Sequence, residues 1–215
     1  MKHILVILVL ALFVPTLQAE TVVAQGTSSR RQEMLQRYAR KSAVKQVLTA
    51  EQFLEVARKG DTDAIASVTQ LDFFKQTDKF SNNCFHLAKD AATVQALAAA
   101  IRRLDNNFQA EIKRLRNQRN DMGETPLLAH INYGKADTFA LLYEGSDLAE
   151  AVREVRLVDK GGALSVTASI KKGIARSLSQ DISGRTVAQA ALANMEQPGM
   201  ASVVEYFQIH APYLF

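Results

Sequence analysis

Apolar residues recur at helical spacing in short segments of this chain, and glycines interrupt these segments. The first segment follows Thr49 and carries an apolar stripe at Phe53, Leu54, Val56 and Ala57. Thr49 followed by Gln52 is the pattern of a capping box, which satisfies free amides at the start of a helix. The pattern predicts a helix that ends at Gly60 and a second short helix over residues 61–68.

Three glycines share one spacing relative to the next apolar residue. Gly60, Gly134 and Gly199 each stand five residues before an apolar residue, namely Ile65, Phe139 and Val204. Because glycine enters the left-handed conformation without a steric penalty, it readily ends one helix and turns the chain back. We expect each of these glycines to end a first helix, and the apolar residue five positions on to be the first buried residue of a return helix.

Two of the predicted helix pairs are preceded by similar turns. The segments Gly123-Glu-Thr-Pro-Leu127 and Gly184-Arg-Thr-Val-Ala188 each place a threonine two residues after a glycine. Thr125 and Thr186 are predicted helix caps, and Pro126 suits the first helical position, where no amide hydrogen is missed. A related segment at residues 84–88 reads Cys-Phe-His-Leu-Ala but lacks the glycine.

These segments resemble ankyrin-repeat proteins, whose units carry the pattern T-P-L-H-x-A at a period of about 33 residues. The unit from Gly123 to Gly145 is the most similar. The resemblance implies an all-α fold over residues 47–215, an ankyrin-repeat solenoid of about four to five helix-pair units with atypical caps and an insertion. Taking Gly60, Ala92, Gly134 and Gly199 as equivalent gives unequal intervals. These intervals imply extra residues near 104–119 and, at about 148–180, either an inserted arm or a degenerate repeat with Gly173 as its turn.

The first residues of the chain have the pattern of an export signal. Lys2 and His3 precede an unbroken apolar run over residues 4–14, after which Pro15 breaks the helix. A membrane span needs about 20 apolar residues, so residues 1–19 are predicted to be a cleaved signal peptide rather than an anchor. Residues 20–46 are predicted to be a linker and a basic N-terminal helix. The protein is therefore expected in the periplasm, with secretion as the alternative.

Composition adds few candidates for chemistry. Of the 215 residues, 47% are hydrophobic and 22% are charged, with a net charge of +4. This balance suits one well-buried domain and identifies no partner. Cys84 is the only cysteine, which excludes an internal disulfide and every multi-cysteine metal site. We expect Cys84 to be a small buried residue, although its place at a helix N-terminus leaves a reactive thiol open.

No arrangement of residues predicts catalysis. Ser42–Lys45 and Ser169–Lys172 fit the S-x-x-K pattern of wall-active serine enzymes, but the sequence lacks the S-D-N and K-T-G partners of that chemistry. His86, His130 and His210 lack the i, i+4 spacing that brings two imidazoles to one metal. We therefore expect no catalytic residue, no metal and no cofactor. His86 is expected to hydrogen-bond its own or the next turn, and His130 to be a core or groove histidine.

A second concentration of basic residues lies near the middle of the chain, at Arg102, Arg103, Lys113, Arg114, Arg116 and Arg119. Two interpretations stay open: a solvated helix with internal charge pairs, or a face for an acidic protein surface. Nucleic acid is not an expected partner, because the protein is predicted to be exported and only Phe108 is available there to stack on bases.

The resemblance also implies how the protein acts, because stacked repeats leave a concave surface that usually binds other proteins. The implied contact residues lie at turn tips and in the groove: Asp121, Met122, Glu124, Asn132, Tyr133, Lys135, Asp181, Ile182 and Arg185. The expected function is an inhibitor or immunity protein that covers an exported enzyme, such as a peptidoglycan hydrolase or an endopeptidase. The alternative is a scaffold or a secreted host-directed effector that bridges proteins without inhibition. A monomer before binding and no stable membrane insertion are expected.

Overall fold

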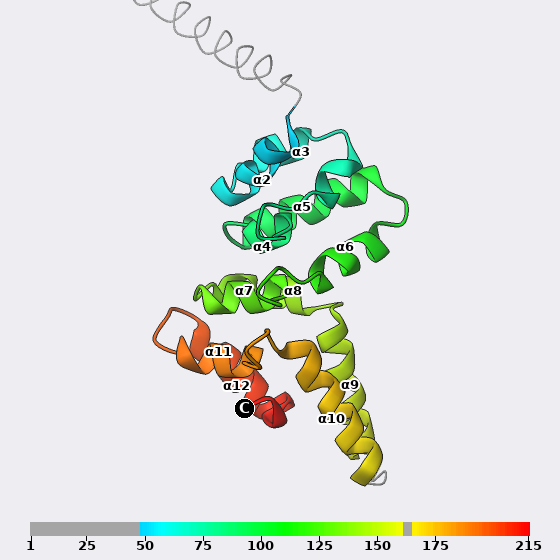
Figure 1. Cartoon of the computed structure of the whole chain (residues 1–215), viewed down its shortest axis with the longest axis vertical. Coiled ribbons are helices and arrows are strands. Elements are labelled where there is room, and N and C mark those ends of the chain that lie inside the picture. The colour runs from blue at the N-terminus through cyan, green and yellow to red at the C-terminus, as the bar shows by residue number, and fades with distance from the viewer. Residues whose placement is uncertain (1–47, 161–164) are drawn as a thin grey trace, which may run out of the picture. The chain divides into compact units, whose positions relative to one another are not determined.

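The computed structural model describes residues 48–160 and 165–215, and these residues form helices joined by loops (Figure 1). The one pairing of extended residues in these ranges is an isolated antiparallel bridge between Gln180 and Thr186. The described chain is thus all-α, as expected from the sequence. The predicted signal peptide at 1–19 and the predicted linker and basic helix at 20–46 lie outside the described residues.

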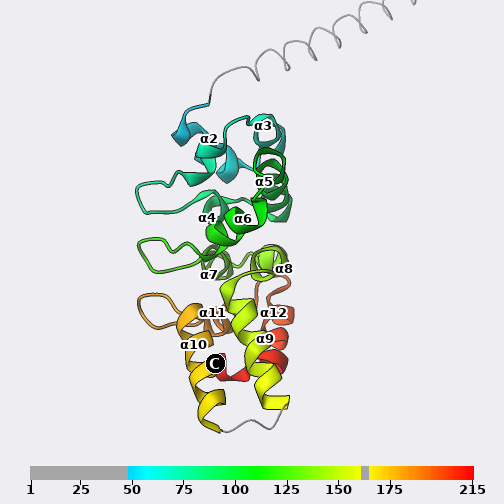
Figure 2. The same cartoon turned by 90° about the vertical axis from the view of Figure 1, so that its right-hand side faces the viewer.

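Most of the helices belong to two rows that lie side by side (Figure 2). The first row consists of α2 (Ala50–Lys59), α4 (Cys84–Leu87), α7 (Pro126–Asn132) and α11 (Val187–Ala193). The second row consists of α3 (Thr62–Ser67), α5 (Ala91–Leu104), α8 (Phe139–Tyr143) and α12 (Met200–His210). Consecutive helices of the first row are in contact, as are α3 with α5 and α5 with α8. The rings of Phe139 on α8 and Tyr206 on α12 lie 5.3 Å apart, which completes the second row.

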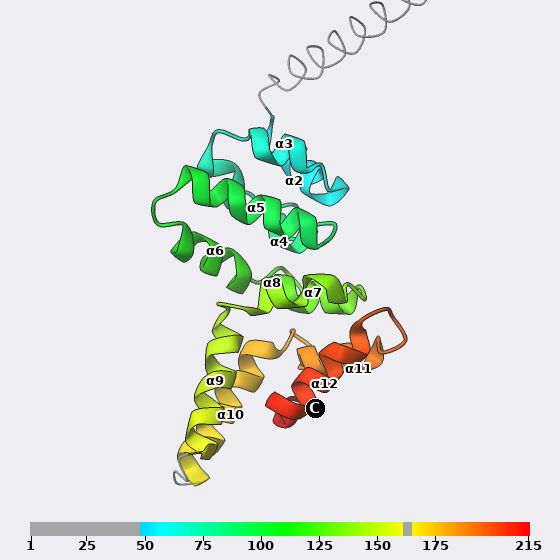
Figure 3. The ribbon, with the colours of Figure 1, turned by 180° about the vertical axis from the view of Figure 1, so that it is seen from behind.

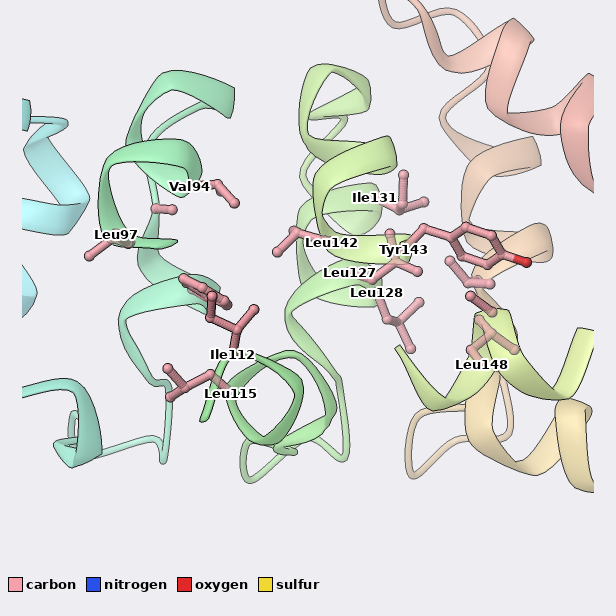
Figure 4. Packing of buried hydrophobic residues seen from close by; sticks show 14 of the residues in the cluster. Val94, Leu97, Ile112, Leu115, Leu127, Leu128, Ile131, Leu142, Tyr143 and Leu148 are labelled. Atoms are coloured by element: carbon pink, nitrogen blue, oxygen red, sulfur yellow. The ribbon is translucent and has the colours of Figure 1, made fainter. Parts of the chain in front are cut away.

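One hydrophobic core runs through these layers. Phe53, Leu97, Leu128 and Phe207 come from four successive helix pairs, and all four are fully buried. Figure 4 shows how side chains of α5, α7 and α8, such as Leu97, Leu128 and Leu142, turn into the space between the helices. Each pair therefore buries its apolar residues against its neighbours, and each large side chain contributes about 1.5–3 kcal/mol.

Local capping explains where several helices begin and end. Thr49 and Gln52 form the predicted capping box: the Thr49 amide donates to Gln52 Oε1 at 2.8 Å, and the Gln52 amide donates to Thr49 Oγ1 at 3.3 Å. The predicted end of α2 at Gly60 is also confirmed, with a left-handed φ of 74°. Thr125 and Thr186 cap α7 and α11 through their side chains, and Pro126 is the first residue of α7.

Gly134 follows α7 and turns the chain back in the way that a glycine permits. Its φ is 73°, its amide donates to the Ile131 carbonyl at 3.1 Å, and the Lys135 amide donates to the His130 carbonyl at 2.9 Å. These two bonds form a Schellman motif, which satisfies carbonyls at the helix end.

Two of the four positions taken as equivalent have other places in the structure. Ala92 lies in the first turn of α5, because α4 is only four residues long and already ends at Ala88. Gly199 has a left-handed φ of 77°, but it precedes α12 and does not end α11. Asn194 ends α11 instead, and its side-chain amide donates to the carbonyls of Ala190 and Ile131, each at 3.1 Å.

The extra residues form additional helices. α6 (Phe108–Asn117) occupies the region near 104–119, and the region at 148–180 holds α9 (Asp147–Lys160) and α10 (Ser165–Ser179), which pack along one another (Figure 3). Gly173 lies inside α10, so the prediction that it marks a turn is wrong. Three short 3-10 helices complete the described chain: η1 (Leu71–Lys75), η2 (Ala136–Thr138) and η3 (Pro212–Leu214). None of the helices in the described ranges is long and apolar enough to cross a bilayer.

Candidate functional site

Three loops of the chain share one hydrogen-bonding pattern. In each loop a side-chain oxygen of an Asp or Asn accepts the backbone N–H groups two and four residues later. Asp78 accepts from Phe80 and Asn82 at 2.9 Å, Asn120 from Met122 and Glu124 at 3.0 and 2.9 Å, and Asp181 from Ser183 and Arg185 at 2.8 and 3.0 Å. Five residues after each Asp or Asn stands the cap of a first-row helix, at Asn83, Thr125 and Thr186. The three loops are therefore structural repeats.

The backbone conformation of the loops repeats as well. Gly123 and Gly184 have left-handed φ angles of 73° and 81°, and Ser81 takes the equivalent place in the first loop with a φ of 62°. A serine in this conformation is strained relative to glycine. The first loop was not predicted from the sequence, because it has Ser81 where the other two loops have a glycine.

Backbone hydrogen bonds join the loops into a row. The Asp121 amide donates to the Phe80 carbonyl and the Ile182 amide donates to the Met122 carbonyl, both at 3.1 Å. Figure 2 shows the three loops one beside the next, on the side of the first-row helices away from the second row. At their tips Phe80, Met122 and Ile182 are 56%, 58% and 71% exposed. The row thus presents three large apolar side chains to solvent, which we call the tip row.

A groove lies beside the first of these loops. Its volume is about 1130 Å³, and its walls come from α2, the loop at residues 76–82, α4 and the end of α7. The apolar part of the lining includes Leu54, Leu87, Phe80 and Tyr133, and the Tyr133 side chain is 77% exposed. Phe80 belongs both to the groove and to the tip row, so the two surfaces are continuous.

The charges in the groove largely satisfy one another. Arg58 lies 2.6 Å from Glu55 and 3.6 Å from Asp78. Burial would raise the pKa of Asp78, but hydrogen bonds from the Asn82 and Phe80 amides outweigh this and hold that pKa below its usual value. Lys135 donates to the Ala88 carbonyl at 2.9 Å, and burial lowers its pKa. The groove therefore has a mixed apolar and polar lining, in which Arg58 is paired with Glu55 and Asp78.

The predicted contact residues divide into two groups. Met122 and Ile182 belong to the tip row and Tyr133 is exposed in the groove, so these three side chains are accessible. The polar residues hold the loops in place. Ser81 donates to Asp121 at 2.5 Å, Asn132 donates to Glu124 at 2.7 Å, and Asp181 accepts the Arg185 amide. Leu54, Arg58 and Phe80, which sequence reasoning missed, line the groove with Tyr133 and Lys135.

Two buried histidines tie neighbouring layers together. His86 Nε2 donates to the carbonyl of Glu124 in the next loop at 3.0 Å, which confirms that His86 bonds a turn. His130 is fully buried, with Nε2 3.0 Å from the Phe85 carbonyl and Nδ1 3.0 Å from Thr138 Oγ1. Burial lowers the pKa of both histidines, for His130 to about 4. Both are therefore neutral structural residues at neutral pH.

Cys84 and the S-x-x-K match at Ser169–Lys172 lack the surroundings that reactivity needs. Cys84 is fully buried, and burial raises its pKa to about 12, so its thiol is protonated. Ser169 is exposed, and Lys172 pairs with Asp159 at 3.1 Å, whereas the serine-enzyme mechanism needs both groups in a desolvated pocket. Ser42–Lys45 lies outside the described residues.

The basic residues near the middle of the chain connect separate elements. The guanidinium group of Arg119 donates to the carbonyls of Ser177 and Leu178 at the end of α10 and of Gln180 just after it. It also donates to the carbonyl of Gly123 in the second loop. Arg103 donates in the same way to Ala66 and Val68 at the end of α3, and Arg116 to Glu144. Lys113 reaches Asp147 and Glu150 on α9. Only Arg114, paired with Glu111 at 2.7 Å, fits the predicted intrahelical pairing.

No protein-family model, no curated protein and no solved structure matches this chain. Any function assigned to it therefore depends on the groove, the tip row and the residues that support them. Among the described residues, no group of three or more His, Cys, Asp or Glu side chains is placed to hold a metal ion.

Proposed function

We propose that this protein is an ankyrin-type repeat protein that binds another protein outside the cytoplasm and performs no catalysis itself. The exposed apolar tip row beside the groove is the observation that carries this proposal. In this function the protein is an inhibitor or immunity protein, and it covers the active site of an exported enzyme such as a peptidoglycan hydrolase or an endopeptidase.

The ankyrin-type assignment is supported by features that recur from layer to layer. Helix pairs in two rows and loops with one hydrogen-bonding pattern recur along the described chain, as in stacked units, and His86 bonds the next loop at Glu124. The Thr125–Pro126 start of α7 agrees with the motif of that family.

The binding role is supported by the chemistry of the tip row. Phe80, Met122 and Ile182 expose apolar area that each would lose to a partner, at about 25 cal/mol for each Å² removed from water. The bonds between the loops hold the backbone at these positions, so little backbone conformational entropy is lost on binding. Tyr133 adds an aromatic residue of the type that dominates binding energy at protein interfaces.

Occlusion is the mechanism that such a surface favours. A standard tight interface buries about 800 Å² on each partner, which requires the tip row and the groove together. The loops project as a ridge, and a ridge of apolar tips fits a cleft on the partner. Filling the active-site cleft of an enzyme would exclude its substrate without any chemistry by the inhibitor.

The test is capture of the partner followed by an activity assay. The chain purified after export is immobilised and exposed to periplasmic extract of its own source, and any bound enzyme is assayed at increasing inhibitor concentration. We expect a wall hydrolase or endopeptidase whose activity falls in proportion to the bound fraction. An enzyme that stays fully active when saturated would contradict inhibition and favour a scaffold.

A further inference from the structure

The outward face of α10 is apolar. Val166, Ile170 and Ile174 are 67%, 59% and 52% exposed. Val166 and Ile170 lie on the opposite side of the helix from Ala168 and Ala175, which are buried, and Ile174 lies at the edge of this outward face. Positions 166, 170, 173 and 177 follow one another at intervals of four, three and four residues. This spacing is typical of a helix that packs along a second helix, and the described residues leave this stripe uncovered.

Gly173 makes a hollow in the middle of that stripe. A Cβ atom added to Gly173 would meet nothing within 4 Å, and its φ is not in the left-handed region. The described fold therefore does not require glycine here, although glycine weakens a helix interior relative to alanine. A hollow beside large side chains is what a facing helix needs in order to interdigitate.

We infer that α10 packs antiparallel against α10 of a second copy of this chain, about a two-fold axis between Lys171 and Lys172. In this pairing Ile170 would enter the hollow at the partner's Gly173, and Val166 would lie on the partner's Ser177. Each copy supplies the same knob and the same hollow, as a two-fold contact requires. The stripe is its own complement, which favours a second copy over an unrelated helix.

The charges near the axis permit this pairing. A two-fold axis brings identical residues together, so a charged side chain that faced the axis would repel its own copy. Lys171 and Lys172 are turned away from the stripe and are paired within the chain, to Glu154 at 3.3 Å and to Asp159 at 3.1 Å. The residues that would meet are Val, Ile, Gly and Ser, none of which is charged.

The size of the contact sets its strength. α10 has 15 residues and is about 22 Å long. One helix pair buries less than the roughly 800 Å² per partner of a standard interface. We therefore expect a reversible dimer with a dissociation constant in the micromolar range, in place of the monomer expected from the sequence. The dimer is independent of the proposed function, because the groove is built from α2, α4 and α7.

Sedimentation over a concentration series tests the dimer. The full chain should shift from monomer to dimer, and both Ile170→Asp and Gly173→Leu should weaken the dimer at least tenfold. A Cβ atom at position 173 would meet nothing within 4 Å, and leucine favours a helix interior more than glycine does, so the melting temperature should not fall. Ile209→Asp, on an exposed residue of α12, is the matched control and should dimerise normally. A chain that stays monomeric at millimolar concentration would overturn the inference.

Cysteine pairs test the orientation. A mixture of Ile170→Cys and Gly173→Cys chains, and a mixture of Val166→Cys and Ser177→Cys chains, should each form a disulfide-linked dimer under mild oxidation. Val166→Cys alone should not link to itself, because the antiparallel arrangement places the two copies of residue 166 at opposite ends. Cys84 is buried, so the unmodified chain serves as the background. Linkage of Val166→Cys to itself, or of neither mixture, would contradict the antiparallel contact.

Discussion

Ile182 donates its backbone N–H to the carbonyl oxygen of Met122 at 3.1 Å, although α9 and α10 separate the two residues in the sequence. The Asp121 amide makes the equivalent bond to Phe80, also at 3.1 Å. The third loop therefore meets the second in the same way as the second meets the first. This relationship supports an inserted arm at α9–α10, since the row of loops continues past it unchanged.

Gly123 allows this close approach of the loops. A Cβ atom there would lie 2.7 Å from Ile182 Cγ2 and 2.9 Å from the Ile182 amide nitrogen, so Gly123→Ala must push the third loop away. The left-handed φ adds about 1 kcal/mol of strain for any other residue. We expect Gly123→Ala to lower the free energy of unfolding, measured in urea, by about 2–3 kcal/mol.

Gly184→Ala separates the backbone strain from the steric contact between the loops. Its φ of 81° brings the same backbone strain, but its nearest neighbouring atom, Gln180 Nε2, is 4.0 Å from the added Cβ. This variant should therefore lose only about 1 kcal/mol. If the two variants lost the same free energy of unfolding, contact between the loops would not be the reason that position 123 requires glycine.

Arg119 is expected to hold the arm to the row of loops. Arg119→Lys keeps the charge, but its single ammonium group cannot bond carbonyls on both elements. We expect the free energy of unfolding to fall by only about 1 kcal/mol, because the Arg119 side chain is exposed. Hydrogen exchange should rise at the C-terminal turn of α10. Arg153→Lys on the exposed face of α9 is the control, and the same loss in this variant would mean that the Arg119 bonds do not hold the arm.

The predictable parts of this fold are the local ones. Thr49 with Gln52, and Thr125 with Pro126, act within a few residues, so the sequence alone identifies these helix starts. Gly60 and Gly134 also act within one turn. Gly199 is identified by its spacing to Val204 and Ala92 by its equivalence to the glycines, and both identifications fail because α4 is short and because Asn194 ends α11.

The less predictable parts depend on contacts between distant segments. Arg103 and Arg119 belong to one concentration of basic residues in the sequence, but in the structure each bonds carbonyls that come from another element. Phe80 was missed because Ser81 replaces the glycine of the other loops. The position of Asp78, five residues before the helix cap Asn83, is the signal that could have identified the first loop.

His130 should make stability depend on pH. Burial lowers its pKa in the folded protein to about 4, from an ordinary value of 6.5, so the unfolded chain binds more protons between these values. Its contribution is fully present above pH 6.5 and is lost as the pH falls toward 4, by about 3 kcal/mol. His86, whose pKa burial also lowers, acts in the same direction.

Urea unfolding at several pH values measures this effect. His130→Gln should be less stable at neutral pH and should lose much of the decline between pH 6.5 and 4. His210→Gln, at the end of α12, should keep that decline. A decline of the same size in the His130 variant would mean that other groups cause it.

The tip row and Tyr133 should determine binding without supporting the fold. Met122→Arg places a charge where an apolar side chain would be desolvated, and Tyr133→Ala removes an exposed aromatic ring, so each should weaken binding of the captured partner by about 2 kcal/mol. Melting temperatures should be unchanged, because both side chains are mostly in solvent. Ile209→Arg makes a similar change on α12, away from the loops, and should bind normally. Normal affinity in both Met122→Arg and Tyr133→Ala would place the contact on another face, whereas loss in Ile209→Arg as well would point to an effect of charge alone.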